Sequence, residues 1–166
     1  MHIQNKALLR STVFLGGKWI AADSGASITV RDPATGAQLA EVPNCGAPET
    51  RRAIAAAEAA LPTWRGQTAK QRAQLLQRWF SLINQNAEDL AQLITAEGGK
   101  PLVEARGEVA YGASFVEWFA EEGKRTYGET IPATVADKRL VVIKQAIGVC
   151  AAITPWNFPL AMITRK

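Results

Sequence analysis

The chain has 166 residues, of which 48% are hydrophobic and 20% charged, as in an ordinary globular protein that is long enough for a real core. The net charge is only +4 and bases lie among acids along the helices, as in residues 121–125, so nucleic-acid binding is not expected. Two distant cysteines do not make a disulfide framework, and Pro155 and Pro159 interrupt the one long uncharged segment, 147–163, which excludes a membrane helix there.

Short strands are expected first along the chain. The segment Phe14–Ile20 predicts a hairpin, because Gly16-Gly17 can adopt the positive φ angles of a two-residue turn. Two more strands are predicted at 27–31 and 38–42. Residues 32–36 should form the turn between them, because proline and glycine occupy turn-favouring positions there.

Two helices are predicted next. The first begins at Pro48, which suits a first helical turn, and Pro62 is expected to end it. Thr68 and Gln71 have the spacing of a capping box for the second helix. The apolar residues of that helix recur at helical spacing and predict a core stripe: Leu75, Leu76, Trp79, Leu82 and Ile83.

Two further helices follow. Asn86 is expected to cap one that ends at Gly98-Gly99, and Pro101 is expected to open a long one. Small Gly112 and Ala113 should let a neighbouring element pack closely on the long helix. Its predicted core face comprises Ala105, Val109, Gly112, Val116 and Phe119.

The pattern then changes to strands and a bend. Residues 140–143 predict one strand, and Gly148–Ile153 predicts a buried second one that contains Cys150. Trp156-Asn157 follows between two prolines, which forbid regular helix or central strand. An amide on such a bend is well placed to donate a hydrogen bond into a cleft. The alternative is a structural proline loop in which Asn157 caps a helix.

Several segments resemble the NAD(P)-dependent aldehyde dehydrogenase family, and within it the branch that acts on succinate semialdehyde. They are residues 153–166, 97–102, 104–109 and 118–125, in the family's order and spacing. Two positions depart from the pattern: Ala146 replaces a usual proline, and Gly98 a usual glutamine.

The resemblance implies an α/β fold and a truncated chain, because family members are much longer. Residues 1–125 would form the N-terminal part of the cofactor-binding domain. Residues 126–147 resemble the arm that pairs with a partner subunit, which implies a homo-oligomer. Residues 148–166 would begin the Rossmann-like cofactor-binding sheet, which stays incomplete.

The resemblance also implies a chemistry. In the family, a cysteine thiolate attacks the aldehyde, hydride leaves for NAD or NADP, and a glutamate activates the hydrolytic water. Both catalytic groups belong to segments that lie downstream of residue 166. Neither Cys45 nor Cys150 is expected to be the nucleophile, and His2, in a terminus expected to be frayed, is the only histidine. No metal site is predicted.

By resemblance, Asn157 donates a hydrogen bond to the developing oxyanion. Ile153, Thr154, Pro155 and Trp156 line the path of the cofactor together with Asn157. Arg165 matches an arginine that binds the carboxylate of a semialdehyde substrate, although Arg165-Lys166 could equally be a basic surface pair. If a helix starts near Phe158, Asn157 and Arg165 lie about two turns apart and can face one cleft.

Two other functions stay open. The chain could be a non-catalytic fragment that acts as an interaction or pairing module, or residues 49–125 could form an independent helical binding module. The second alternative leaves the Trp-Asn bend unexplained. No secretion signal follows Lys6 and Arg10, so a cytoplasmic location is expected. The choice between NAD and NADP, and between succinate and glutarate semialdehyde, is not determined by these residues.

Overall fold

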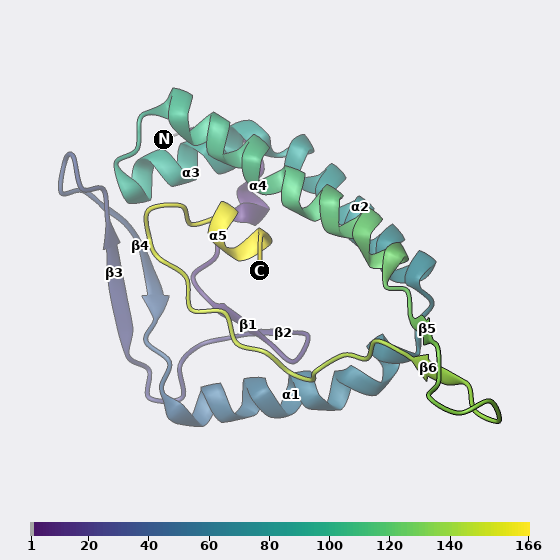
Figure 1. Ribbon diagram of the computed structural model, residues 1–166. Helices are drawn as coiled ribbons and strands as arrows, with labels where there is room; N and C mark the ends of the chain where they lie inside the picture. Colours follow the sequence, from purple (N-terminus) through teal and green to yellow (C-terminus); the bar gives the residue numbers. More distant parts are fainter. Residues whose placement is uncertain (1) are drawn as a thin grey trace.

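The computed structural model describes residues 2–166. Figure 1 shows α2, α3 and α4 together and α1 apart from them, with the C-terminal stretch running between. The strands form three separate two-stranded sheets. In chain order the elements are η1 Lys6–Leu8, β1 Val13–Leu15, β2 Lys18–Ile20, β3 Ser27–Arg31, β4 Gln38–Pro43, α1 Ala47–Gly66, α2 Ala69–Gln85, α3 Ala87–Gly98, α4 Leu102–Glu122, η2 Gly123–Arg125, β5 Glu129–Ile131, β6 Leu140–Val142 and α5 Ala161–Thr164.

The first two hairpins are confirmed. β1 pairs antiparallel with β2, and Gly16 and Gly17 in the turn have φ angles of 57° and 82°. β3 pairs antiparallel with β4 through the predicted turn, where the Gly36 amide donates to the Asp32 carbonyl at 2.8 Å. These local elements follow from turn chemistry alone, since the required positive φ angles fall on glycines.

The prediction that Pro62 ends the first helix is wrong, because α1 continues to Gly66 with Pro62 inside it. Proline removes the hydrogen bond to the Glu58 carbonyl and usually kinks a helix. Pro62 is exposed, so water can satisfy that carbonyl and the helix persists for one more turn.

The other helix ends are close to prediction. The Thr68 hydroxyl accepts from the Gln71 amide, and the Gln71 side chain accepts from the Thr68 amide, as in a capping box. Gly99 ends α3 in the left-handed conformation at φ 73°. Asn86 occupies the N-cap position of α3 but makes no capping bond, because its side chain contacts Leu82 and Asn5 instead.

Helix α4 lies at the centre of the core and packs against α2, α3 and α5. Its predicted face is confirmed from Ala105 to Val116, whereas Phe119 is exposed and Ala120 is buried in its place. The stripe of α2 is only partly core, since Leu75, Trp79 and Leu82 are 43–49% exposed and only Ile83 is fully buried. The buried cluster comprises Ile83, Ala91, Ile94, Ala105, Val109, Ala113 and Val116.

The N-terminal segment is anchored rather than frayed. Ile3 is buried, and the carboxylate of Asp89 in α3 accepts the backbone N–H groups of Gln4 and Asn5 at 3.0 and 2.7 Å. Both hydrogen bonds lower the pKa of Asp89. The expectation of a frayed terminus overlooked Asp89 as a partner for these backbone groups.

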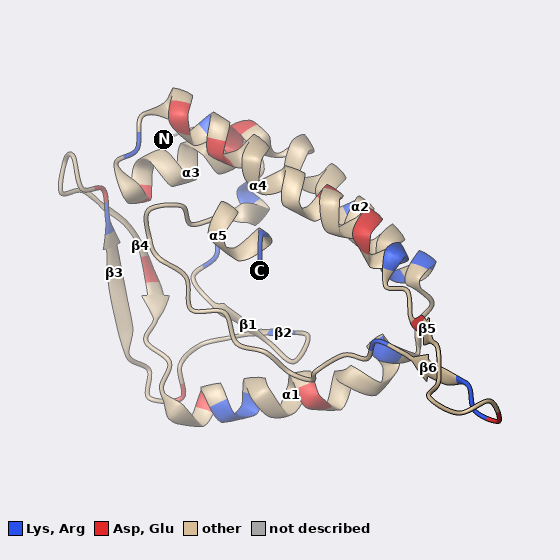
Figure 2. Ribbon diagram, in the orientation of Figure 1, with Lys and Arg blue, Asp and Glu red and all other residues tan. Residues whose placement is uncertain are grey.

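The region after α4 contains the largest departure from prediction. β5 and β6 form a hairpin that projects from the end of the helices, with its loop carrying Lys and Arg near an acid (Figures 1 and 2). The strand expected at Gly148–Ile153 is absent, and that segment is extended but unpaired. A strand needs a hydrogen-bonded neighbour, and none lies beside this segment within residues 2–166.

Candidate functional site

The proline-bracketed bend presents Asn157 on the surface. Residues 156–160 form consecutive turns and bends, and Asn157 is exposed. Its backbone carbonyl accepts a hydrogen bond from the Lys100 ammonium at 2.8 Å, while its side-chain amide has no hydrogen-bond partner within residues 2–166. The backbone of Asn157 is thus held, and its amide stays available to a ligand.

Asn157 does not cap the following helix. The first amides of that turn, Leu160 N–H and Ala161 N–H, point instead at the Glu108 carboxylate, at 3.0 and 3.5 Å from its Oε1. A carboxylate at this place satisfies the donors that a helix start leaves unpaired. The alternative in which Asn157 serves as a helix cap is therefore wrong for this structure.

Glu108 and Lys100 were not predicted as site residues. Glu108 is 3% exposed on the buried face of α4, and its Oε2 forms an ion pair with the Lys100 ammonium. That ammonium also lies 3.8 Å from the centre of the Phe158 ring, within range of a cation–π contact. The sequence does carry a signal, because Glu108 is a charged residue between Ala105 and Gly112 on an apolar helical face.

The helix expected to start near Phe158 begins instead at Ala161 and has a single turn, α5, which the turns and bends of residues 156–160 precede. Backbone bonds run from Met162 to Phe158 at 3.0 Å and from Arg165 to Ala161 at 3.2 Å. Gly112 lets this segment approach α4 closely, because a Cβ at Gly112 would lie 2.9 Å from Leu160 Cγ. The expectation that Gly112 admits a close neighbour is confirmed.

The residues expected along the path of the cofactor are accessible. Ile153 is 98% and Trp156 is 81% exposed, Pro155 is exposed and Thr154 is half-buried. They present apolar surface, an indole and a hydroxyl along an unpaired backbone. That surface suits contact with a planar ring and a ribose, so the residues present fit a dinucleotide.

Trp156 also borders a hollow of about 630 Å³ between the bend and α3. Glu97 lines this hollow. Much of Glu97 is exposed, yet the apolar surroundings remove part of the hydration of its carboxyl group and raise its pKa. The remaining lining residues are Pro33, Leu90, Leu93, Ile94, Gly98, Pro159 and Leu160.

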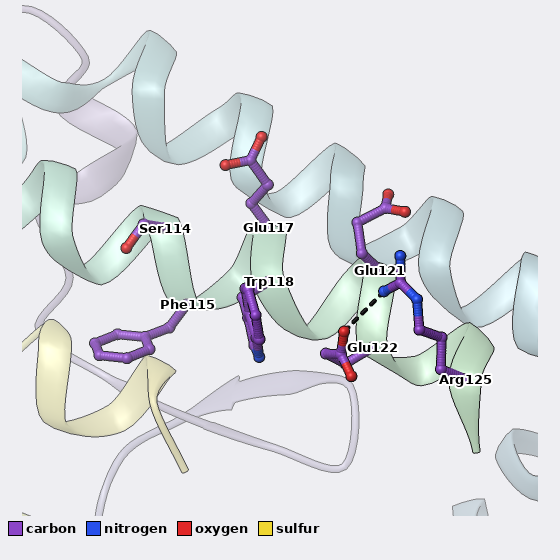
Figure 3. A pocket seen from close by; sticks show the side chains of 7 residues that line it. All are labelled: Ser114, Phe115, Glu117, Trp118, Glu121, Glu122 and Arg125. Atoms are coloured by element: carbon purple, nitrogen blue, oxygen red, sulfur yellow. Dashed lines mark hydrogen bonds and ion pairs between the residues drawn. The ribbon is translucent and has the colours of Figure 1, made fainter. Parts of the chain in front are cut away.

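Arg165 directly follows α5, beside α4. It is exposed, and its guanidinium carbon lies 6.0 Å from the centre of the Phe115 ring. Figure 3 shows Phe115 at one end of an open groove of about 590 Å³ along α4, with the Glu122–Arg125 ion pair of 2.7 Å at the other. Arg165 has no carboxylate partner within residues 2–166, so its charge is free to bind an anion.

The surroundings of Cys150 differ from the prediction. Cys150 is exposed rather than inside a strand, and its thiol contacts the Gly148 carbonyl at 3.8 Å. Cys45 is partly buried. In the described part of the chain, no cluster of His, Cys, Asp and Glu could hold a metal ion. Among residues 2–166, no helix has both the length and the apolar character needed to cross a bilayer.

Comparison with known proteins agrees with the resemblance. The chain is 59% identical to the glutarate-semialdehyde dehydrogenase of Pseudomonas putida and 58% identical to the NADP(+) succinate-semialdehyde dehydrogenase GabD of Escherichia coli. Each alignment covers 100% of this chain but only 35% and 34% of the relative. The chain therefore spans about a third of the length of the curated relatives it matches.

Solved structures confirm the expected fold. The succinate-semialdehyde dehydrogenase of Burkholderia pseudomallei superposes with a TM-score of 0.97 at 60% identity, over 99% of this chain and 34% of that one. The mixed helices and strands are thus those of an aldehyde dehydrogenase segment. The model of the aldehyde dehydrogenase family matches residues 19–166. The chain belongs to the aldehyde dehydrogenase family.

Proposed function

We propose that this chain contributes the oxyanion-binding part of an enzyme that oxidises a short aldehyde carrying a distal carboxylate, with NAD or NADP as hydride acceptor. The observation that carries the proposal is the bend at Asn157. Its backbone is fixed by Lys100, and its side-chain amide lacks a partner in the described part of the chain. The relatives are named as dehydrogenases of glutarate and succinate semialdehydes, which supports the substrate class.

Asn157 acts on the aldehyde oxygen. Attack of a thiolate on the carbonyl carbon moves negative charge onto that oxygen, and an N–H donor already in place stabilises the charge. The amide nitrogen of Asn157 supplies such a donor without first breaking another hydrogen bond. Because the bend is fixed before substrate arrives, little reorganisation accompanies the reaction.

Arg165 binds the other end of the substrate. A guanidinium can hold a carboxylate through two parallel, charge-assisted hydrogen bonds. Arg165 is exposed and lies against Phe115, whose ring can pack on the methylene groups of a semialdehyde. The carboxylate would thus be held where α5 ends, on the segment that begins with the bend at Asn157.

Ile153, Thr154, Pro155 and Trp156 would form one wall of the cofactor site together with Asn157. When bound, the nicotinamide accepts the hydride that leaves the aldehyde carbon. The exposed side chains of Ile153 and Trp156 bind and orient the planar parts of the cofactor, and they exclude water from that wall.

The projecting hairpin supports an additional pairing function. Every residue of β5 and β6 is exposed, and a two-stranded hairpin has open edges that can pair with another strand. We assign residues 126–147 to an arm that contacts a second subunit of a homo-oligomer, residues 1–125 to the cofactor-binding domain and residues 148–166 to the start of its sheet.

The function is tested in a chimera in which residues 1–166 replace the matching third of the E. coli relative. Asn157→Ala should lower kcat for succinate semialdehyde by about 10²–10³-fold and should raise the Kd of NADP by a much smaller factor. Asn84→Ala is the matched control, because the Asn84 amide only contacts the Phe80 carbonyl of its own helix. A kcat near that of the parent chimera in Asn157→Ala would refute the assignment.

A further inference from the structure

The ion pair between Lys100 and Glu108 is the most deeply buried one in the described chain. The side chain of Glu108 has 0% of its surface exposed and that of Lys100 has 15%, whereas Arg106 and Glu88, a pair nearby on α4 and α3, are 53% and 48% exposed. Burying two charges removes their hydration, and apolar residues of similar volume are often as stabilising. Stability alone therefore does not account for this pair.

The pair connects the start of α4 with the bend, which lies more than 50 residues later in the sequence. Lys100 precedes α4, Glu108 lies within it, and both contact the bend and the turn that follows. Lys100 donates to the Asn157 carbonyl at 2.8 Å, and the Glu108 carboxylate accepts from Leu160 N–H at 3.0 Å. The Lys100 ammonium thus holds the backbone at Asn157 itself, and the Glu108 carboxylate holds it three residues later, at Leu160.

These contacts constrain the bend where its own sequence cannot. Pro159 has no N–H, and the unpaired stretch before Thr154 gives no sheet from which the bend could be held. An apolar pair in place of Lys100 and Glu108 would fill the space but would give the carbonyl of Asn157 and the amide of Leu160 no partner. The two charged side chains therefore fix the position of the bend through its backbone groups, which apolar side chains that merely fill the space would not do.

We propose that Lys100 and Glu108 are positioning residues for Asn157, holding its backbone so that the side-chain amide is aimed at the oxyanion. This proposal rests on the proposed function of Asn157. Catalytic donors must be held within about 0.5 Å of the productive geometry, and a displacement of about 1 Å can lower a rate by about 10²-fold. Lys100 and Glu108 act through Asn157 and touch neither substrate nor cofactor.

The test uses the same chimera and a double-mutant cycle. Lys100→Met is expected to lower kcat by about 10–10²-fold, with the Kd of NADP unchanged. Arg106→Met is the matched control, because it removes a nearby but exposed ion pair between α4 and Glu88 of α3. In the Asn157→Ala background, Lys100→Met should change kcat by about twofold or less, because the group that it positions is already gone.

A second variant separates positioning from folding. Lys100→Met leaves Glu108 as a buried unpaired charge and can unfold the protein, so Lys100→Met/Glu108→Leu is measured as well. The double variant should recover part of the thermal midpoint that Lys100→Met loses, since no charge stays buried, yet keep the low kcat. Recovery of kcat together with the midpoint would overturn the proposal.

The two proposals fail in different ways. If Asn157→Ala keeps the parent kcat, the oxyanion function of Asn157 is wrong. If Asn157→Ala is impaired but Lys100→Met behaves like Arg106→Met, the positioning proposal alone is wrong. Losses from Lys100→Met and Asn157→Ala that multiply independently would also overturn it, because they would show that Lys100 does not act through Asn157.

Discussion

The helical unit of α2, α3, α4 and α5 and the stretch from Ile143 to Trp156 are both rich in apolar residues, but only the first buries them. Val109 and Val116 in α4 are almost fully buried, whereas Ile147 and Ile153 are 94% and 98% exposed. A helix satisfies its backbone within itself and needs only a packing partner for one face. A strand needs a hydrogen-bonded neighbour first, so the second stretch stays open.

The comparison also separates two ways of placing a functional group. Asn157 lies where the open stretch meets the buried unit, and its position depends on Lys100 and Glu108 from the buried side. Ile153 and Trp156, on the open side, have no such anchors among residues 2–166. We therefore expect substitutions in the buried unit to act on geometry, and those in the open stretch to act on solubility and contacts.

The largest expected effect concerns the 166-residue chain by itself. We expect no turnover with succinate semialdehyde and NAD or NADP, because by resemblance the nucleophile and the hydrolytic base are not among these residues. The open stretch should also make the chain self-associate. Absorbance of the reduced cofactor measures turnover, and size-exclusion chromatography measures self-association.

Ile153→Lys provides the control for that experiment. It places a charge on the exposed stretch and should raise the monomer fraction without creating activity. Steady turnover that copurifies with the 166-residue chain would contradict the expectation. Cys150, which is exposed, would then be the first residue to test as a nucleophile.

Arg165→Ala tests the edge of the buried unit. In the chimera, kcat/KM for succinate semialdehyde should fall by about 10–10²-fold, the loss expected for charge-assisted hydrogen bonds to a carboxylate. Butanal, which has the same chain length without the carboxylate, should be little affected. Equal losses on both aldehydes would mean that Arg165 has a structural role instead.

Gly112→Ala tests how tightly the bend packs on the buried unit. The added Cβ would lie 2.9 Å from Leu160 Cγ, so the variant should lose about 1–3 kcal/mol of unfolding free energy through overpacking. Gly107→Ala is the matched control on the same helix. Its Cβ would meet nothing within 4 Å, so it should gain about 0.5–1 kcal/mol. Urea titration of the chimera measures both, and equal shifts would mean that the close contact carries no strain.

The smallest expected effect is at the N-terminal anchor. Two backbone donors lower the pKa of Asp89 in the folded state, so this carboxylate stabilises the fold above its unfolded pKa of about 4. That contribution is lost as the pH falls through the lowered pKa. Asp89→Asn should therefore show a weaker decline of the thermal midpoint between about pH 4 and pH 2 than the parent. If the thermal midpoints of Asp89→Asn and the parent fell equally over this pH range, the stabilising role of the Asp89 carboxylate would be contradicted.

What the sequence predicts well in this chain is local. The Gly16-Gly17 turn, the Thr68–Gln71 capping box and the Gly99 helix end each depend on residues within one turn of each other. The strand at 148–153 was wrong because its β-branched residues indicate a preference, while pairing depends on partners elsewhere. Leu75, Trp79 and Leu82 of the α2 stripe are likewise exposed, because burial depends on which elements pack against α2 and not on the helical spacing of its apolar residues.

In the candidate site, too, local motifs can be read from the sequence, whereas contacts between distant segments cannot. Asn157 and Arg165 are predicted as site residues from a resemblance to a family motif that lies within residues 153–166, and their roles stay predictions. Glu108 and Lys100 were missed, since a charged residue on an apolar helical face indicates a buried partner without saying which one. Only the structure brings Lys100 to Asn157 and Glu108 to Leu160, across 57 and 52 residues of chain.

Those sequence separations have a consequence for folding kinetics. Helices α2, α3 and α4 form from contacts between neighbours along the chain, whereas the bend can be fixed only after a loop of more than 50 residues has closed. The hairpins and helices should therefore assemble early, and the segment that carries Asn157 should dock after them. The helices and hairpins would then form before Asn157 reaches its final position. If the bend docks slowly, refolding protein would show its full circular dichroism signal before the chimera regains activity.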